Sequence, residues 1–532
     1  MFDYAIKNGW IVDGTGKKPY RAAVYVQGER IAEISEDETL EAKEVFDAAG
    51  LAVAPGFIDM HTHSDTAPYC SNGFESALTQ GITFHCAGNC GGSLIPDTPE
   101  IHGKRGRSDS KSRYKNPITG DYAAHDFASY KDEVTGLGTA INFSTLIGHG
   151  RLRHCAMSDP KEPIPTAEEM RRMEEILEEQ MKQGAPGMSL GLTYLPGACC
   201  KTEELIALGK VIAKYDGIIA VHMRSESEKV FEALDEMGRV ARESGAHVHI
   251  SHFKIMHASL WGRVPELLEK FDALRAEGLN FTADQYPYNA SSTGLTAVIP
   301  MWLRSRKDTT SLEWMESDEK FARIRDEMQT LLDGRGGAEH VIVSNTRGAM
   351  PEYEGKTVAQ IAREWGMEPI DAVREIFIRT KCSVSAIYYC MDMNDVLKIM
   401  ARQDVAVASD GIGYNNLACD AAGRPHPRSV GTFVRFLRLN REHQLMPLEA
   451  AVRKMTSIPA AHLHLKDRGR LEKGCFADIT VFDPETIADR ATFDEISLPA
   501  TGVACVLVNG VKAFENGKST GSRSGKFLAA EK

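Results

Sequence analysis

Short apolar runs alternate with longer amphipathic stretches through the middle of the chain. The short runs are bounded by Gly, Pro, Asn and Asp, which is typical of buried strands, and the longer stretches repeat apolar residues with a helical period. The runs predict eight strands, at Gly56–His61, Ile82–Ala87, Ala140–Leu146, Met188–Leu192, Ile218–His222, His247–His252, Asn280–Asp284 and Val405–Ser409. The stretches predict helices between several of them, for example Thr166–Gln183, Lys201–Tyr215, Glu228–Ser244 and Pro265–Glu277. Eight strands alternating with helices are what a (β/α)₈ barrel requires.

Two further apolar runs, His340–Ser344 and Val384–Cys390, exceed the strand count of a barrel. One or both must therefore lie in an insertion before the last barrel strand.

Both ends of the chain carry β-type runs of a different kind. Tyr4–Ile6, Trp10–Val12 and Ala23–Val26 are separated by Gly-containing turns, and Asn509-Gly510 forms a hairpin signal near the other end. We therefore expect an α/β protein with a barrel at residues 55–466 and a small β-sandwich module built from both termini, residues 1–54 and 467–532. The Gly-, Ser- and Lys-rich tail from Gly517 is expected to be poorly ordered.

Composition and charge narrow the class of partner. The 532 residues are 42% hydrophobic and 26% charged, as in ordinary globular proteins, with a formal net charge of −12. An acidic chain argues against a nucleic acid or an anionic membrane as partner, and no apolar stretch approaches the roughly 20 residues of a membrane helix. The N-terminus enters a strand pattern without the features of a signal peptide, and the eleven cysteines are an odd number. These features predict a cytoplasmic protein, and they indicate no oligomeric state.

The first barrel strand leads into a histidine pair. His61 and His63 follow Pro55-Gly56-Phe57-Ile58-Asp59, and side chains two residues apart on a strand share a face. Two imidazoles at the carboxyl end of a strand make half of a metal site. Such a spacing also arises by chance, and we interpret the two other pairs, His247/His249 and His462/His464, as structural or surface histidines.

Further candidate ligands stand at the ends of other strands. His222, His252 and Asp410 each finish a predicted strand, and Cys90 lies in the glycine-rich turn Gly88-Asn89-Cys90-Gly91-Gly92 after the second. The carboxyl ends of barrel strands gather at one face, so we expect these side chains to meet there. A thiolate, imidazoles and a carboxylate together predict a metal centre.

This constellation resembles the N-acyl-D-amino-acid deacylase (D-aminoacylase) family of the metal-dependent amidohydrolase superfamily. Many relatives in the superfamily bridge their metals with a carboxylated lysine of the fourth strand, but that strand, Gly187–Leu192, has no lysine here. The Gly-Asn-Cys-Gly turn after the second strand is the feature that matches the D-aminoacylases. The similarity runs from about residue 5 to residue 525 and includes the following motifs: Thr193-Tyr194-Leu195-Pro196-Gly197, Tyr286-Pro287-Tyr288, Ser291-Ser292-Thr293-Gly294, Pro425-His426-Pro427-Arg428 and Met455-Thr456-Ser457-Ile458-Pro459-Ala460.

The resemblance implies a zinc-dependent hydrolase that cleaves the amide bond of N-acyl-D-amino acids. By position, Cys90, His222 and His252 correspond to a tight zinc site, and His61, His63 and Asp410 to a second, weaker one. Asp410 is then expected to act as general acid and base on the water that the metal activates. The residues that match substrate-handling positions are Tyr194, Lys254, Tyr286, Ser292 and Arg428.

Three other interpretations stay open at this point. A cyclic-amide hydrolase, such as a dihydropyrimidinase or dihydroorotase, shares the barrel but has the fourth-strand lysine. A non-catalytic binding protein of the same fold is expected to have lost ligands, and an unrelated barrel enzyme would use the histidines structurally.

A polar segment inside the loop from Asn89 to Glu133 departs from the family pattern. It contains Gly103-Lys104-Arg105-Gly106-Arg107 and Lys111-Ser112-Arg113. A solvated loop is the ordinary fate of such a charge run, whereas folding over the barrel mouth would favour an acidic or bulky substrate.

Overall fold

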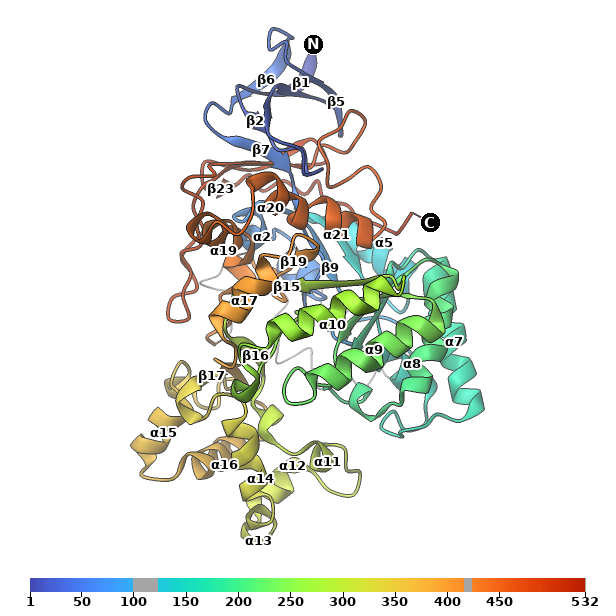
Figure 1. The fold of residues 1–532 in the computed structure, drawn as a ribbon, viewed down its shortest axis with the longest axis vertical. Helices are drawn as coiled ribbons and strands as arrows, with labels where there is room; N and C mark the ends of the chain where they lie inside the picture. The colour runs from blue at the N-terminus through green and yellow to red at the C-terminus, as the bar shows by residue number, and fades with distance from the viewer. Residues whose placement is uncertain (99–122, 416–422, 532) are drawn as a thin grey trace.

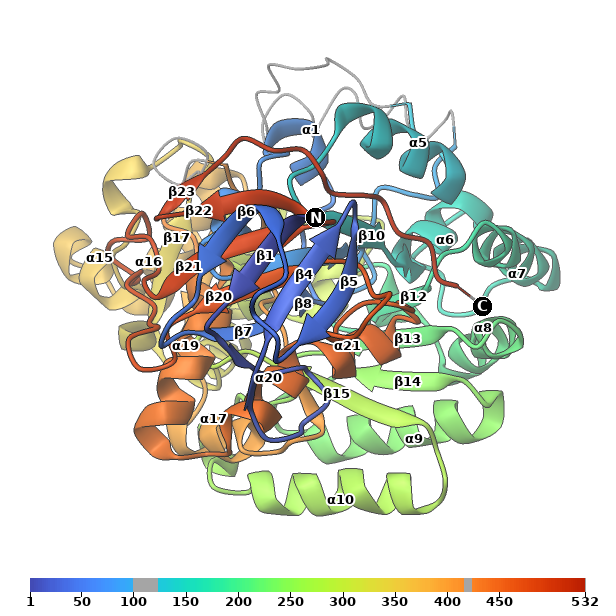
Figure 2. The same ribbon diagram turned by 90° about the horizontal axis from the view of Figure 1, so that it is seen from above.

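A ring of parallel strands forms the centre of the computed structural model, which describes residues 1–98, 123–415 and 423–531 (Figures 1 and 2). The strands of the ring are β8 Phe57–Asp59, β9 Ile82–Ala87, β10 Asn142–Thr145 with its continuation β11 Ile147–Gly148, β12 Gly187–Gly191, β13 Ile218–His222, β14 His247–Ile250, β15 Phe281–Gln285 and β19 Val405–Val407. They pair in chain order from β8 to β19. The ring closes where Thr62 forms a parallel bridge with Gly411 and the His63 N–H donates to the Gly411 carbonyl over 2.7 Å. All eight predicted barrel strands are confirmed.

Three strands end two residues earlier than predicted. The strands expected to reach His61 and Ser409 stop at Asp59 and Val407, and β14 stops two residues before His252. The carboxylate of Asp59 accepts the N–H groups of His61 (3.3 Å) and Ser409 (3.0 Å), so a side chain takes the place of the strand ladder there. At His252 the backbone turns to φ +39°, which a strand cannot accommodate.

Helices cover the outside of the ring (Figure 2). Those predicted from the pattern are α7 Ala167–Lys182, α8 Thr202–Lys214, α9 Val230–Ser244 and α10 Val264–Ala276. The predicted capping box is present, since Thr166 Oγ1 accepts the Glu169 N–H and Glu169 Oε2 accepts the Thr166 N–H. The four helices are confirmed to within two residues at either end.

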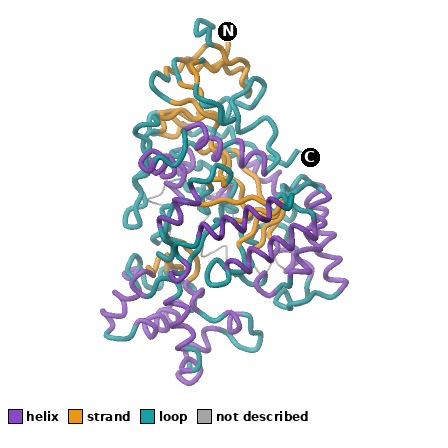
Figure 3. The backbone as a smooth tube through the Cα atoms, viewed as in Figure 1, coloured by secondary structure: helices purple, strands orange, loops and turns teal. Residues whose placement is uncertain are grey.

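An insertion between β15 and β19 forms a separate lobe of mostly helical structure (Figures 1 and 3). Its sheet is antiparallel, with β18 Ser385–Tyr388 between β16 Ser291–Gly294 and β17 Val341–Asn345. Its helices include α11 Met301–Arg304, α12 Ser311–Glu316, α13 Asp318–Ala322, α14 Arg325–Asp333, α15 Val358–Trp365 and α16 Pro369–Thr380. Both surplus apolar runs therefore lie in the insertion.

Two sheets lie beside the barrel, and the second combines strands from both ends of the chain. One contains β5, β4, β1 and β6, at Arg30–Ser35, Ala23–Gln27, Phe2–Lys7 and Ala42–Asp47. The other pairs β7 Ala52–Pro55 with β20 Ile479–Phe482, and continues through β21 Val503–Val508 to β22 Val511–Glu515. Asn509 and Gly510 both have positive φ, which forms the predicted hairpin turn. The module built from both termini is confirmed, while its division from the barrel at residues 54/55 and 466/467 stays a prediction.

The C-terminal tail is ordered up to residue 531, so the prediction of poor order was wrong. Phe527 is buried, and its ring lies 6.0 Å from that of Phe143 on β10. The Leu528 N–H donates to the Phe143 carbonyl over 2.7 Å. Burial of this ring and backbone hydrogen bonds hold a segment whose composition otherwise favours disorder. No helix among the described residues is long and apolar enough to cross a membrane.

Candidate metal centre

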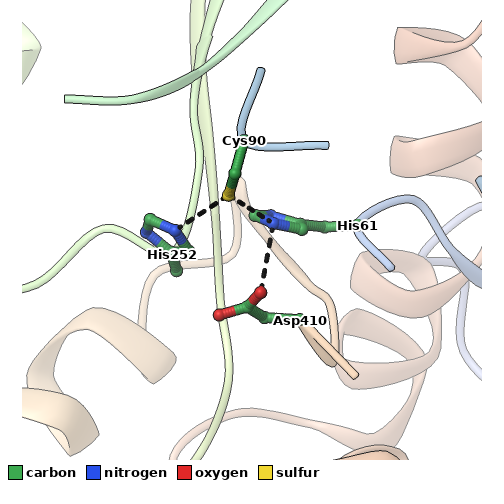
Figure 4. A group of neighbouring side chains, drawn as sticks. All are labelled: His61, Cys90, His252 and Asp410. Atoms are coloured by element: carbon green, nitrogen blue, oxygen red, sulfur yellow. Dashed lines mark hydrogen bonds and ion pairs between the residues drawn. The ribbon is translucent and has the colours of Figure 1, made fainter. Parts of the chain in front are cut away.

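Four buried side chains converge at the carboxyl end of the barrel (Figure 4). His61 follows β8, Cys90 follows β9, His252 follows β14 and Asp410 follows β19. Their nitrogen, sulfur and oxygen atoms all lie within 4.8 Å of one another. Residues far apart in the chain therefore offer one ligand atom each to a common point.

The Cys90 sulfur is the atom on which the histidines converge. It lies 3.5 Å from His61 Nε2, 3.5 Å from His252 Nε2 and 3.8 Å from His222 Nδ1. His63 stands at the edge of the group, with Nε2 2.9 Å from Asp410 Oδ1. The structure thus brings together all six residues that the sequence proposes as ligands, and the two expected sets meet at Cys90.

These separations fit a tetrahedral zinc ion. Bond lengths of about 2.3 Å for Zn–S and 2.0–2.1 Å for Zn–N place the sulfur and nitrogen ligands of a tetrahedron about 3.6 Å apart. The observed sulfur–nitrogen distances of 3.5 and 3.8 Å bracket that value. A soft thiolate with imidazoles is also the donor set that zinc favours over magnesium or calcium.

The electrostatics of the group favour a thiolate at Cys90. Burial raises the pKa of its thiol, but the charge of His61 and hydrogen bonds from His222 and His252 outweigh burial and hold that pKa well below its usual value. For His61 the directions are reversed: burial lowers the pKa of its imidazole, but Asp284 and Cys90 raise it well above normal. The proton that His61 holds toward Cys90 occupies a position that a metal ion would take when it binds.

Two carboxylates that the sequence analysis did not single out orient the imidazoles. Asp284 Oδ2 lies 3.1 Å from His61 Nδ1, and its Oδ1 accepts the backbone N–H of His252 over 2.7 Å. Glu226 Oε1 lies 2.7 Å from His252 Nδ1. Each carboxylate holds one ring nitrogen so that the other faces Cys90, as outer partners of metal-binding histidines do. The available signal was their position: Asp284 ends a predicted strand, and Glu226 follows His222 by four residues.

The turn that carries Cys90 lies directly on β12. The Gly91 N–H donates to Ser189 Oγ over 3.0 Å, and the same hydroxyl donates to the Gly88 carbonyl. A Cβ atom added to Gly191 would lie 2.0 Å from the Cys90 carbonyl oxygen. The strand without a lysine is therefore also the strand that leaves space for the cysteine turn.

Three of the converging residues have strained backbone. Cys90, His252 and Asp410 have φ values of +52°, +39° and +51°. Each such conformation costs of order 1–3 kcal/mol for a residue with a side chain, and persists where the surroundings enforce it. This strain lies at strand ends, where the backbone turns to aim the side chain at the centre.

A cavity of about 540 Å³ opens beside the group. It is lined by His63, Cys90, His252 and Asp410 and by three of the residues proposed for substrate, Tyr194, Ser292 and Arg428. The other two, Lys254 and Tyr286, line a smaller adjoining cavity. The polar segment at residues 103–113, expected to be a solvated loop or else to fold over the barrel mouth, lies outside the described residues.

The two proposed substrate cations already have acidic neighbours. Lys254 Nζ lies 2.5 Å from Glu226 Oε1, and the Arg428 guanidinium donates to Asp410 Oδ2 over 2.6 Å. Arg428 NH2 also lies 3.5 Å from the Ser292 carbonyl. Arg428 therefore fixes the orientation of the Asp410 carboxylate.

Comparison with known proteins matches the chain to a family. The amidohydrolase family matches residues 44–363 and 420–514. An N-acyl-D-glutamate deacylase of Alcaligenes xylosoxydans xylosoxydans is 36% identical over 99% of this chain and 96% of its own, and a D-aminoacylase of the same organism is 35% identical over 99% and 98%. The chain belongs to the D-aminoacylase family of amidohydrolases.

Solved structures of the family agree with this assignment. The N-acyl-D-glutamate deacylase of Bordetella bronchiseptica, complexed with zinc and a phosphonate inhibitor, superposes with a TM-score of 0.83 at 34% identity, over 99% of this chain and 100% of that one. An L-hydantoinase of Arthrobacter aurescens, which represents the cyclic-amide alternative, covers 99% and 100% of the two chains at 15% identity and a TM-score of 0.57. That likeness shows a shared fold alone.

Gly191→Ala tests whether the Cys90 turn depends on β12. The added methyl group must displace the Cys90 carbonyl, so we expect the affinity for zinc to fall by roughly 10- to 100-fold, as for other outer changes at metal sites. Competition with a chromogenic zinc chelator measures it. Gly136→Ala in α5 Phe127–Leu137, where an added Cβ meets no atom within 4 Å, is the matched control. Equal affinities in both variants and the parent would contradict the dependence.

Proposed function

We propose that the protein is a zinc-dependent hydrolase that cleaves N-acyl-D-amino acids into a carboxylate and a D-amino acid. The observation that carries this proposal is the Cys90 sulfur surrounded by three imidazole nitrogens at 3.5–3.8 Å. Two relatives of similar length, an N-acyl-D-glutamate deacylase and a D-aminoacylase, support the reaction and the D configuration.

Six side chains would hold the metal. We assign Cys90, His222 and His252 to the tight site, and His61, His63 and Asp410 to a second, weaker one. Because Cys90 is as close to His61 as to His252, its thiolate reaches both sets. When bound, zinc supplies a Lewis acid that activates water and polarises the amide carbonyl.

Asp410 is the proton carrier in this proposal. Burial raises the pKa of its carboxyl, but the charge of Arg428 and the hydrogen bond from His63 outweigh burial and hold that pKa well below its usual value. The group is therefore ionised at neutral pH. With Oδ2 held by Arg428, Oδ1 is the oxygen that faces the histidines. Oδ1 accepts the proton of the attacking water and returns it to the departing amine nitrogen.

We assign the binding of the substrate's α-carboxylate to Arg428 and Tyr286. The guanidinium of Arg428 has five N–H donors, of which Asp410 and Ser292 use part. The hydroxyl of Tyr286 is buried and has no hydrogen-bond partner within the described ranges. We further assign Tyr194, Ser292 and Lys254 to the walls of the same substrate site.

A cyclic-amide hydrolase is the alternative function, and a non-catalytic binding protein is a weaker one. The cyclic-amide function is disfavoured because β12 contains Ser189 and glycines rather than a lysine. Against the second stands the convergence of all six proposed ligands. We also propose a small molecule as the partner and the cytoplasm as the location, since the ten cysteines among the described residues are all free thiols.

Hydrolysis of matched enantiomers tests the proposal. Zinc-loaded protein is assayed with a panel of N-acetyl-D- and N-acetyl-L-amino acids, with hydantoin and dihydroorotate as controls. We expect turnover of D substrates with kcat/KM higher by roughly 100-fold or more than for the L forms, because metal, carboxylate and side-chain contacts fix three points. Faster opening of either ring than of every acyl amino acid would contradict it.

Asp410→Asn tests the proton carrier. The amide keeps the shape but cannot accept the proton, so we expect kcat to fall by roughly 10²- to 10⁴-fold while zinc at the Cys90 site is retained. The matched control is Asp404→Asn, because that carboxylate also pairs with arginines, Arg275 and Arg402, at the start of β19. Near-normal kcat in Asp410→Asn, measured with zinc content, would show that another group carries the proton.

A further inference from the structure

The smaller cavity, of about 150 Å³, lies between the metal centre and the insertion. It is lined by His222, His252 and Asp410 of the metal centre and also by Arg304 and Arg335. Arg304 is the last residue of α11, and Arg335 follows α14, so both belong to the lobe inserted between β15 and β19. The insertion therefore contributes charge to a space that opens on the reaction centre.

The charges lining this cavity do not balance. Four cations line it, Lys254, Arg304, Arg335 and Arg428, against two carboxylates, Glu226 and Asp410. The carboxylates belong to the other two cations: Lys254 lies 2.5 Å from Glu226, and Arg428 2.6 Å from Asp410. Within residues 1–98, 123–415 and 423–531, Arg304 and Arg335 have no carboxylate within 4.0 Å. Two half-buried guanidinium groups thus face the cavity without a counter-charge.

Arg335 is held in place by an aromatic ring rather than by a carboxylate. The guanidinium of Arg335 lies over the ring of Tyr388, 5.4 Å from its centroid, and Tyr388 in turn donates to the Gly294 carbonyl over 3.0 Å. Burial and the neighbouring charge of Arg335 both lower the pKa of Arg304. The two cations are close enough to repel, and an anion placed between them would remove that repulsion.

The smaller cavity suits the amine half of the substrate. It contains Tyr286 and Lys254, which the larger cavity lacks, and shares Arg428 with it. The α-carboxylate and the side chain are bonded to the same carbon, so a carboxylate at Arg428 and Tyr286 directs the side chain into this space. The acyl group, on the other side of the scissile bond, would then face the larger cavity. A volume of about 150 Å³ admits only a short side chain.

We propose that Arg304 and Arg335 bind a carboxylate on the substrate's side chain, so that the preferred substrates are N-acyl-D-amino acids with an acidic side chain. This inference rests on the proposed deacylase function and narrows its substrate class. Arginine suits this task because its planar fork binds carboxylates with paired hydrogen bonds.

Matched acid and amide substrates test the subsite. N-acetyl-D-glutamate is compared with N-acetyl-D-glutamine, and N-acetyl-D-aspartate with N-acetyl-D-asparagine, since each pair differs in charge with nearly constant shape. We expect kcat/KM of the parent to favour one acid over its amide by at least about tenfold. Arg304→Gln and Arg335→Gln should each lower kcat/KM roughly 10- to 100-fold for that acid and less than about threefold for the amide.

Arg306→Gln is the matched control, because Arg306 is exposed, pairs with Asp308 and does not line the cavity. It should leave both substrates unchanged. Equal rates of acid and amide in the parent would overturn the proposal. Equal losses on both substrates in the Arg304 and Arg335 variants would overturn it as well, because the arginines would then act on the α-carboxylate or on the fold.

A binding measurement separates failure of the subsite from failure of the proposed function. Calorimetry on the zinc-loaded protein compares D-glutamate and D-aspartate with D-glutamine and D-asparagine, independently of turnover. If no acyl amino acid is hydrolysed, the proposed function fails. Tighter binding of an acid that is lost in Arg304→Gln would still support the subsite, and equal binding of acids and amides would overturn it.

Discussion

The contact of the Cys90 sulfur with three imidazole nitrogens is the interaction on which the rest of the site depends. The turn that carries Cys90 is hydrogen-bonded to Ser189 of β12, and it packs so closely against Gly191 that no side chain fits there. On the other side, Asp284 and Glu226 rotate the imidazoles so that their free nitrogens face the sulfur. The barrel strands determine where each ligand lies in the chain's fold. The hydrogen bonds and packing contacts with neighbouring residues determine how each ligand side chain is oriented.

Charge in the buried site is matched almost pair by pair. Lys254 pairs with Glu226, and Arg428 pairs with Asp410, which satisfies charges that would be costly to leave alone away from water. The same pairing gives Arg428 two tasks, since it holds one oxygen of Asp410 and keeps donors for a ligand. Among the cations that line the smaller cavity, only Arg304 and Arg335 have no acidic neighbour in the described part of the chain. That local imbalance is what points to an anionic group on the substrate.

The sequence was enough to predict the barrel and the positions of the proposed ligands. Apolar runs between turn residues located every barrel strand, and candidate ligands at strand ends followed from the geometry of parallel strands. The residues that orient those ligands were harder to predict from the sequence. Glu226 matters because its loop meets the loop of Lys254, and that meeting depends on packing that no local pattern reports. The tail was mispredicted for the same reason, since burial of Phe527 against Phe143 is a long-range contact.

Backbone conformation explains the remaining differences. The strand ahead of His252 ends two residues earlier than its apolar pattern suggests, because His252 adopts positive φ, and Asp410 adopts positive φ beyond the end of β19. Only glycine adopts such angles freely, so a sequence with His or Asp there gives no local sign of the turn. The strain is tolerated where three or more contacts fix the side chain, as at Asp410 between Arg428 and the histidines.

Zinc K-edge X-ray absorption of the purified, zinc-loaded protein tests the central role of Cys90 most directly. A thiolate ligand predicts one sulfur scatterer at about 2.3 Å beside nitrogen and oxygen at about 2.0–2.1 Å. In Cys90→Ser the sulfur shell should vanish. A wild-type spectrum that contains only nitrogen and oxygen scatterers would contradict the account, because zinc would then bind without the residue around which the site is built.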